Sequence, residues 1–162
     1  MNEKIQRQMF NFLLKNGIEN FLGVPDSTLK YFIDQGLNKK KIVITTREDE
    51  AIGIAVGMTL ANSHSLVFMQ NAGFANSLST ITSLIQLYRI PLIFLIGWRG
   101  FLKTDAPEHK QIGKIQPELI KLLGLKSRIV TEKNWENCCK WSKNQIVSGN
   151  SCCLIIRREF ND

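Results

Sequence analysis

The alternation of apolar and polar positions divides this chain into a repeating series of helices and short strands. Apolar residues at helical spacing predict an amphipathic helix over residues 3–16, and Asn16-Gly17 is typical of a helix end. Short apolar runs predict strands over residues 21–24, 41–45, 65–70, 92–97, 128–130 and 152–156. Further helices are predicted over residues 48–61, 76–88, 117–123 and 135–147, and another is predicted to begin at a cap formed by Asp26 or Ser27. Residues 98–113 are predicted to form a long loop.

Strands that alternate with helices indicate βαβ units, in which helices cover both faces of a parallel sheet. A length of 162 residues is usual for one domain. We therefore expect one doubly wound α/β domain over residues 1–162, with a central parallel sheet of about six strands. The helix over residues 48–61 is apolar all round and is expected to be buried. Its Gly53 and Gly57 would allow another helix or a flat ligand to come close.

Composition and charge argue against two classes of function, nucleic-acid binding and membrane insertion. The formal net charge is +7, but the basic residues are spread along the chain, and the densest run, residues 39–41, has no interleaved aromatic residues. We therefore expect no nucleic-acid partner. The longest apolar run, residues 90–97, has the length of a strand, and the first residues form no apolar signal region. These features predict a cytoplasmic protein that does not enter a membrane.

The four cysteines form two adjacent pairs, at residues 138–139 and 152–153. Neither pair has the spacing of metal ligands, so we expect buried thiols and no metal site in this chain.

Polar and glycine residues follow each of the first four predicted strands. Ligands of parallel α/β sheets bind at the carboxyl ends of the strands, so these residues are the candidates for a site. They occupy residues 23–27, 47–50, 70–76, and 97–100 with 105–109. The sequence contains no Gly-x-Gly-x-x-Gly, no Walker loop and no nucleophile elbow, so a nucleotide cradle or a serine hydrolase site is not indicated.

These segments carry a family resemblance when they are taken together and in order. Gly-Val-Pro-Asp-Ser, Arg-Glu-Asp-Glu-Ala, Met-Gln-Asn-Ala-Gly-Phe-Ala-Asn and Ile-Gly-Trp-Arg-Gly begin at residues 23, 47, 69 and 96. The chain from about residue 17 to residue 125 resembles the thiamine-diphosphate-dependent phosphonopyruvate decarboxylases and the alpha subunits of sulfopyruvate decarboxylases. The resemblance implies the pyrimidine-binding domain of that family.

The same resemblance implies a reaction. Trp98-Arg99-Gly100, followed by Asp-Ala-Pro-Glu-His at residues 105–109, is more similar to the phosphonopyruvate enzymes, which implies conversion of phosphonopyruvate to phosphonoacetaldehyde and CO₂. The alternatives are decarboxylation of sulfopyruvate to sulfoacetaldehyde, or a non-catalytic binding module of the same fold.

Glu48 matches the glutamate that activates the cofactor in this family through a hydrogen bond to a ring nitrogen of the pyrimidine. Asp49 and Glu50 are adjacent carboxylates, and counting back from Gly57 favours Glu48. Without the resemblance, a glutamate here would be read as an ordinary first-turn residue. Asp26 is implied as a group that assists proton transfer, with a helix N-cap as the alternative.

Other residues are implied to bind the cofactor because they match positions in the motifs of the same family. The cofactor-binding candidates that follow the strands, with an ordinary turn or a core position as the alternative, are Pro25, Gln70, Asn71, Gly73 and Phe74.

The remaining candidates concern the substrate. Arg99 suits a phosphonate or sulfonate, His109 suits proton relay as a third catalytic residue, and a surface position is the alternative for both. Ser27 is expected to contact the substrate, and Lys103 is a weaker anion candidate.

The family binds the cofactor's diphosphate and Mg²⁺ through a second domain that carries Gly-Asp-Gly followed by an Asn-Asn pair. This sequence contains no Gly-Asp-Gly. The resemblance therefore implies a beta subunit that supplies this half and holds most of the Mg²⁺ contacts, an α₂β₂ or larger assembly, and an inactive isolated chain.

Overall fold

The computed structural model describes residues 1–102 and 104–157, and within them a six-stranded sheet forms the centre of the molecule. All its strand pairs are parallel, and the spatial order is β2-β1-β3-β4-β6-β5. The strands are β1 (Asn20–Gly23), β2 (Ile42–Ile44), β3 (Ser65–Gln70), β4 (Ile93–Trp98), β5 (Lys126–Val130) and β6 (Cys152–Arg157). The predicted α/β class with a parallel sheet of about six strands is confirmed.

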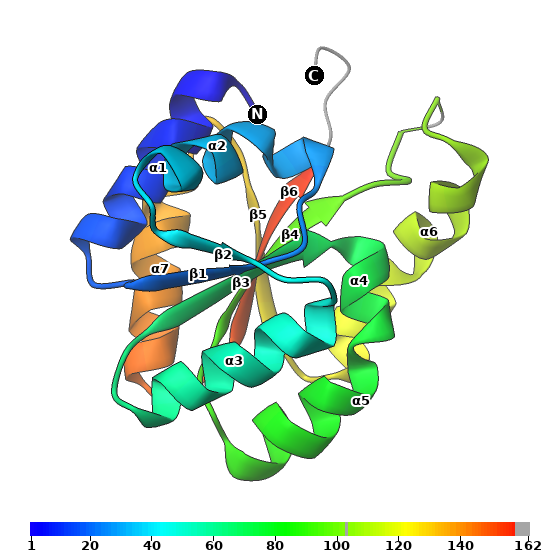
Figure 1. Ribbon diagram of the computed structural model, residues 1–162. Coiled ribbons are helices and arrows are strands. Elements are labelled where there is room, and N and C mark those ends of the chain that lie inside the picture. The colour runs from blue at the N-terminus through cyan, green and yellow to red at the C-terminus, as the bar shows by residue number, and fades with distance from the viewer. Residues whose placement is uncertain (103, 158–162) are drawn as a thin grey trace.

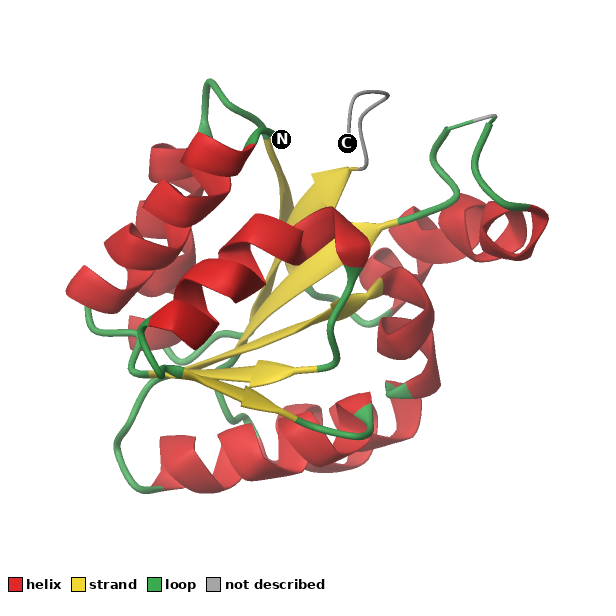
Figure 2. Ribbon diagram, turned by 45° about the horizontal axis from the view of Figure 1, so that its top comes forward, coloured by secondary structure: helices red, strands yellow, loops and turns green. Residues whose placement is uncertain are grey.

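Helices cover both faces of this sheet (Figures 1 and 2). One layer contains α1 (Glu3–Lys15), α2 (Lys30–Asn38) and α7 (Trp135–Val147). The opposite layer contains α3 (Glu48–Leu60), α4 (Asn71–Asn76), α5 (Leu78–Thr80), the π-helical segment η2 (Ile81–Gln86) and α6 (Pro107–Leu122). A short 3₁₀ turn, η1 (Ser27–Leu29), connects β1 to α2.

Each layer encloses its own apolar core. Below α1 and α2 the rings of Phe10, Phe21 and Phe32 contact one another, with centroids 4.4–5.9 Å apart. On the other face Phe74 packs edge-on against Phe94 at 5.6 Å. The apolar strands β3, β4 and β6 are buried on both faces, because they lie between the two helical layers, whereas the edge strand β2 is largely exposed.

Two predicted boundaries on this second face are wrong. The helix after β3 begins at Asn71 rather than at residue 76, and residues 98–113 are not one long loop, because α6 already begins at Pro107. Pro117 suggested a helix start but lies inside α6, where it cannot donate to the carbonyl of Gly113. The Trp98 indole donates to that carbonyl instead, at 3.0 Å, so the helix continues with its backbone acceptor satisfied.

The expectation that α3 is buried all round is also wrong for this chain. Its inner residues face the sheet, but Ile54 is 37% exposed and Leu60 is 69% exposed, because the sheet covers only one side of the helix. The four cysteines are buried and unpaired, as predicted. Burial raises the pKa of the Cys152 thiol to about 12, so this thiol is protonated and inert at neutral pH.

Among the described residues no helix is both long enough and apolar enough to cross a membrane.

The strand order fixes where a site can form. The chain leaves β1 for β2 on one side and then returns to β3 on the other side of β1. The connections after β1 and β2 lie on opposite faces, so the switch point of the sheet, where such folds form a ligand-binding crevice, lies between the carboxyl ends of β1 and β3. The candidate residues follow these strands and the adjacent β4.

Candidate functional site

Asp26 and Gln70 meet at this crevice. Asp26 follows β1 and is only 6% exposed, while Gln70 is the last residue of β3. The Gln70 side-chain amide donates to Asp26 Oδ1 at 2.9 Å, and the Thr28 backbone N–H donates to Asp26 Oδ2 at 2.9 Å. Asp26 therefore caps η1, as the sequence suggested, and also joins the ends of two strands.

The end of β4 leaves room for this carboxylate only because it carries a glycine. A Cβ atom at Gly97 would lie 2.1 Å from Asp26 Oδ2 and 3.2 Å from the Thr28 Cβ. A side chain at residue 97 would thus push Asp26 away from the crevice.

Glu48 lies at the start of α3 and is half-buried. Its side chain packs on the backbone of Gly73 in α4, where an added Cβ would lie 2.2 Å from Glu48 Oε1. The structure thus brings together two residues that are 25 positions apart and that were both predicted to lie beside the cofactor's pyrimidine ring.

Glu48 differs from the two carboxylates that follow it. Asp49 accepts hydrogen bonds from the Arg47 guanidinium, which lower its pKa, and Glu50 accepts hydrogen bonds from Thr46, which lower its pKa. No described residue makes a hydrogen bond to the Glu48 carboxylate. Of the three, Glu48 is therefore the one available to a ligand.

Arg99, directly after β4, is held by a carboxylate to which the sequence analysis gave no role. Asp105 accepts from Arg99 Nε at 3.1 Å and from its Nη2 at 2.7 Å, and also from the backbone N–H groups of Gly100 and Ala106. The side chains of the pair are 12% and 2% exposed. The Arg99 guanidinium, helped by the two backbone donors, holds the pKa of Asp105 well below its usual range. The sequence signal for this ion pair was Asp105, six residues after Arg99, in a segment predicted to be a loop.

The ion pair with Asp105 holds the Arg99 guanidinium close to the turn η1. Arg99 Nη1 lies 3.4 Å from Ser27 Oγ, so the two predicted substrate contacts are neighbours. A hollow of about 330 Å³ beside them is lined in part by Pro25, Asp26, Ser27 and Ile44.

Asn71 and Phe74, which were predicted to contact the cofactor, are both fully buried in this structure. The amide of Asn71, which is fully buried, exchanges hydrogen bonds of 3.0 and 3.1 Å with the backbone of Arg99, so Asn71 ties α4 to the end of β4. Phe74 is fully buried against Phe94 and offers no surface to a ligand, which is the core position that the sequence left open. In this structure both residues hold α4 against β4, and their contact with the cofactor stays a prediction.

His109 lies in the first turn of α6, and its side chain makes no hydrogen bond to the other described candidates. The backbone of this turn is packed closely, since Gly100 has a positive φ of 78° and a Cβ there would lie 1.8 Å from the His109 carbonyl oxygen. Lys103 lies outside the described residues.

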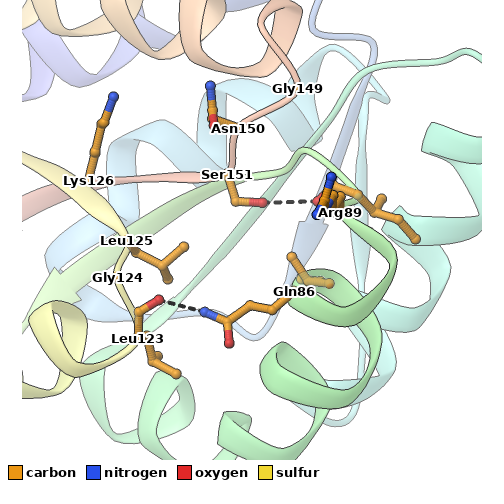
Figure 3. Close-up of a pocket in the computed structure, with 11 residues that line it drawn as sticks. Gln86, Arg89, Leu123, Gly124, Leu125, Lys126, Gly149, Asn150 and Ser151 are labelled. Carbon is orange, nitrogen blue, oxygen red and sulfur yellow. Dashed lines mark hydrogen bonds between the residues drawn. The ribbon is translucent and has the colours of Figure 1, made fainter.

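A second hollow of about 330 Å³ lies at the opposite, amino end of the strands (Figure 3). Hydrogen bonds close its walls: Gln86 donates to the Leu123 carbonyl, and Ser151 donates to the Ile90 carbonyl. None of the predicted site residues lines it.

Comparisons with known proteins identify the family of this chain. Residues 3–121 match the family model described as thiamine pyrophosphate enzyme, N-terminal TPP binding domain, thiamine pyrophosphate being another name for thiamine diphosphate.

Among curated proteins, the chain is 31% identical over 114 residues to sulfopyruvate decarboxylase subunit alpha of Methanococcus maripaludis, covering 69% of this chain and 68% of the relative. It is 34% identical over 108 residues to the protein of the same name in Methanocaldococcus jannaschii, covering 65% of this chain and 64% of the relative. It is 29% identical over 119 residues to phosphonopyruvate decarboxylase of Streptomyces viridochromogenes, covering 72% of this chain but 30% of the relative. The matched region thus spans about two thirds of the first two relatives.

Proposed function

This chain belongs to the thiamine pyrophosphate enzymes, and from that premise we propose that it is the pyrimidine-binding half of a decarboxylase for a small anionic 2-oxo acid. The observation that carries the proposal is the Glu48 carboxylate, which is half-buried, lies against Gly73 and has no hydrogen-bond partner among the described residues. The missing side chain at residue 73 is what allows the Glu48 carboxylate to lie against α4.

The residues of the crevice fit thiamine diphosphate. When bound, this cofactor supplies the electron sink that the loss of CO₂ from a 2-oxo acid requires. In our proposal Glu48 holds a proton at a ring nitrogen of the pyrimidine, and the Gln70 side chain orients Asp26 beside the reacting end. Asp26 is placed to deliver a proton to the carbon that loses CO₂.

The substrate contacts follow from Arg99 and Ser27. Asp105 already occupies Arg99 Nε and Nη2, so Nη1 beside the Ser27 hydroxyl is the part aimed away from the ion pair. An acid whose far end carries a phosphonate or a sulfonate offers acceptor oxygens for these donors. The relatives include enzymes named for sulfopyruvate and for phosphonopyruvate, and they favour neither acid. We also propose His109 as the proton relay. It lies in the first turn of α6, directly after the segment that Asp105 ties to Gly100.

We also propose a beta subunit that carries the diphosphate-binding and Mg²⁺-binding half, in an α₂β₂ or larger assembly in the cytoplasm. Three relatives are named as alpha subunits, which supports a separate partner chain. The four buried free thiols suit a reducing compartment.

The test is aldehyde release from sulfopyruvate and from phosphonopyruvate by this chain co-expressed with its candidate partner, in the presence of thiamine diphosphate and Mg²⁺. Glu48→Gln should abolish turnover. Asp49→Asn is the matched control, because it alters the adjacent carboxylate, which is bound to Arg47. The control should keep most of the activity.

The outcomes separate the proposals. Turnover that depends on Glu48 establishes the decarboxylase, and the acid with the higher kcat/KM identifies the substrate. Equal activity of the wild type and Glu48→Gln would refute the role of Glu48. An assembled complex without turnover of either acid would instead point to the non-catalytic module.

A further inference from the structure

A second candidate site lies under α6, apart from the crevice between β1 and β3. A cavity of about 170 Å³ is enclosed by α6 and the face of β4, β5 and β6. Its lining residues are Trp98, Gln116, Pro117, Ile120, Ser127, Ile129, Ile155 and Arg157. Pro117 and Ser127 are the exposed members of this set, so the cavity opens beside the edge strand β5.

The cavity contains polar groups without partners. Gln116 is fully buried, and neither its Nε2 nor its Oε1 has a hydrogen-bond partner. Arg157 Nε is likewise buried and unpartnered. An amide buried without partners loses the hydrogen bonds that it makes to water, and native proteins rarely leave such groups unpaired. Water or a small polar ligand in the cavity can supply these hydrogen bonds.

The positive charge of Arg157, which lines the cavity, indicates the charge that a ligand would carry. The Arg157 carbon Cζ lies 4.7 Å from the centroid of the Trp98 ring and 4.2 Å from that of Phe101, so the guanidinium is held against two aromatic rings. Within the described part of the chain no acidic side chain forms an ion pair with Arg157. Burial lowers the pKa of Arg157, which fits a cation without a counter-ion. The Arg157 side chain as a whole is half-buried, so its charge lies at the mouth of the cavity, where an anion can reach it.

Three features together define the ligand. Arg157 and Gln116 Nε2 require acceptors, and a carboxylate supplies them with the matching charge. Gln116 Oε1 requires a donor, which a hydroxyl group supplies. Ile120, Ile129 and Ile155 form an apolar wall that suits a short alkyl group. The volume limits the ligand to a few heavy atoms.

We propose that this cavity binds a small 2-hydroxy carboxylate, with its carboxylate on Arg157 and its hydroxyl on Gln116. This inference does not rest on the proposed decarboxylase activity, because it uses residues of α6, β5 and β6 rather than the crevice.

The test uses the purified 162-residue chain and isothermal titration with three probes. L-lactate carries the charge, the hydroxyl and a methyl group, acetate lacks the hydroxyl, and 2-propanol lacks the charge. We expect saturable one-to-one binding of lactate, binding of acetate weaker by about tenfold for one lost hydrogen bond, and none of 2-propanol.

Variants assign the binding to this cavity. Arg157→Met keeps the stem and removes the charge, and Gln116→Leu keeps the volume and removes the amide; each should weaken lactate binding by at least about tenfold. Gln116→Leu should also raise the melting temperature, since it removes a buried unpaired amide. Gln145→Leu is the matched control, because Gln145 Oε1 in α7 is also buried and unpartnered but lies outside the cavity. It should bind lactate like the wild type.

Two results of the binding measurements would overturn the proposal. One is the absence of saturable lactate binding, and the other is binding that is unchanged in both Arg157→Met and Gln116→Leu. A crystal grown with lactate that shows only ordered water under α6 would also refute it. Because the readout is binding to this chain alone, a failure here is distinguishable from a failure of the decarboxylase assay.

Discussion

Replacing Gly73 with alanine should separate the stability of this protein from its activity. Gly73 lies inside α4, and its backbone is compatible with any residue. Alanine is favoured over glycine in a helix interior by about 1 kcal/mol. In a domain of this size that gain corresponds to a rise in melting temperature of about 2–4 °C.

The same methyl group should displace Glu48. The added Cβ would lie 2.2 Å from Glu48 Oε1, whereas ordinary contacts of a Cβ atom begin at 3.4 Å. The flexible Glu48 side chain can retreat more easily than the backbone of α4, so its carboxylate should shift by about 1 Å. A misplacement of that size at a catalytic group costs about 100-fold in rate.

We therefore expect Gly73→Ala to keep or raise the melting temperature and to reduce kcat/KM for the preferred 2-oxo acid by about 100-fold. Calorimetry on the chain and aldehyde release by the assembled enzyme measure the two quantities. Gly57→Ala is the matched control for helix propensity, because nothing lies within 4 Å of its added Cβ. Its melting temperature should rise, and its assembly with the partner should be checked by mass photometry.

A double-mutant cycle tests whether the effect acts through Glu48. The shorter side chain of Glu48→Asp moves the carboxylate away from residue 73, so Gly73→Ala should cost less activity in that background than in the wild type. The reasoning fails if Gly73→Ala retains activity within about twofold of the wild type, a change far below the one that displacement implies. It also fails if the loss is the same in both backgrounds.

Further predictions concern the segment that links β4 to α6. Asp105→Asn should destabilise the fold by about 2–3 kcal/mol in chemical denaturation, because it leaves Arg99 without its buried anion; the exposed Asp49→Asn should change little, and an equal effect of both would contradict this. Because the folded-state pKa of Asp105 is lowered, its contribution is present above the ordinary value of about 4 and is lost as the pH falls, so the difference between wild type and Asp105→Asn should shrink from pH 7 to pH 3. Trp98→Phe should cost about 1–3 kcal/mol by leaving the Gly113 carbonyl unpaired. Pro117→Ala supplies the missing helical N–H and should recover part of that loss; no recovery would show that the indole bond is not what permits proline inside α6.

The sequence by itself determined the order and type of nearly all strands and helices. The period of the apolar positions reports directly which side of an element is buried, so the parallel sheet and the α1 helix followed from it. The segments after the strands were also found from sequence, because parallel strands place their carboxyl ends on one edge. The sequence favoured Glu48 among three adjacent acids, and in the structure the other two are bound by Arg47 and Thr46. The catalytic role of Glu48 stays a prediction.

Only the tertiary structure decided what the side chains in those segments contact. Asn71 and Phe74 read as ligand contacts along the chain, but their surroundings come from β4, more than 20 residues away in sequence. Likewise Pro117 signals a helix start locally, and it is tolerated inside α6 because the Trp98 indole binds the carbonyl that proline cannot. Hydrogen bonds and packing between distant segments form only when the chain is folded, and the local pattern of apolar residues does not encode them.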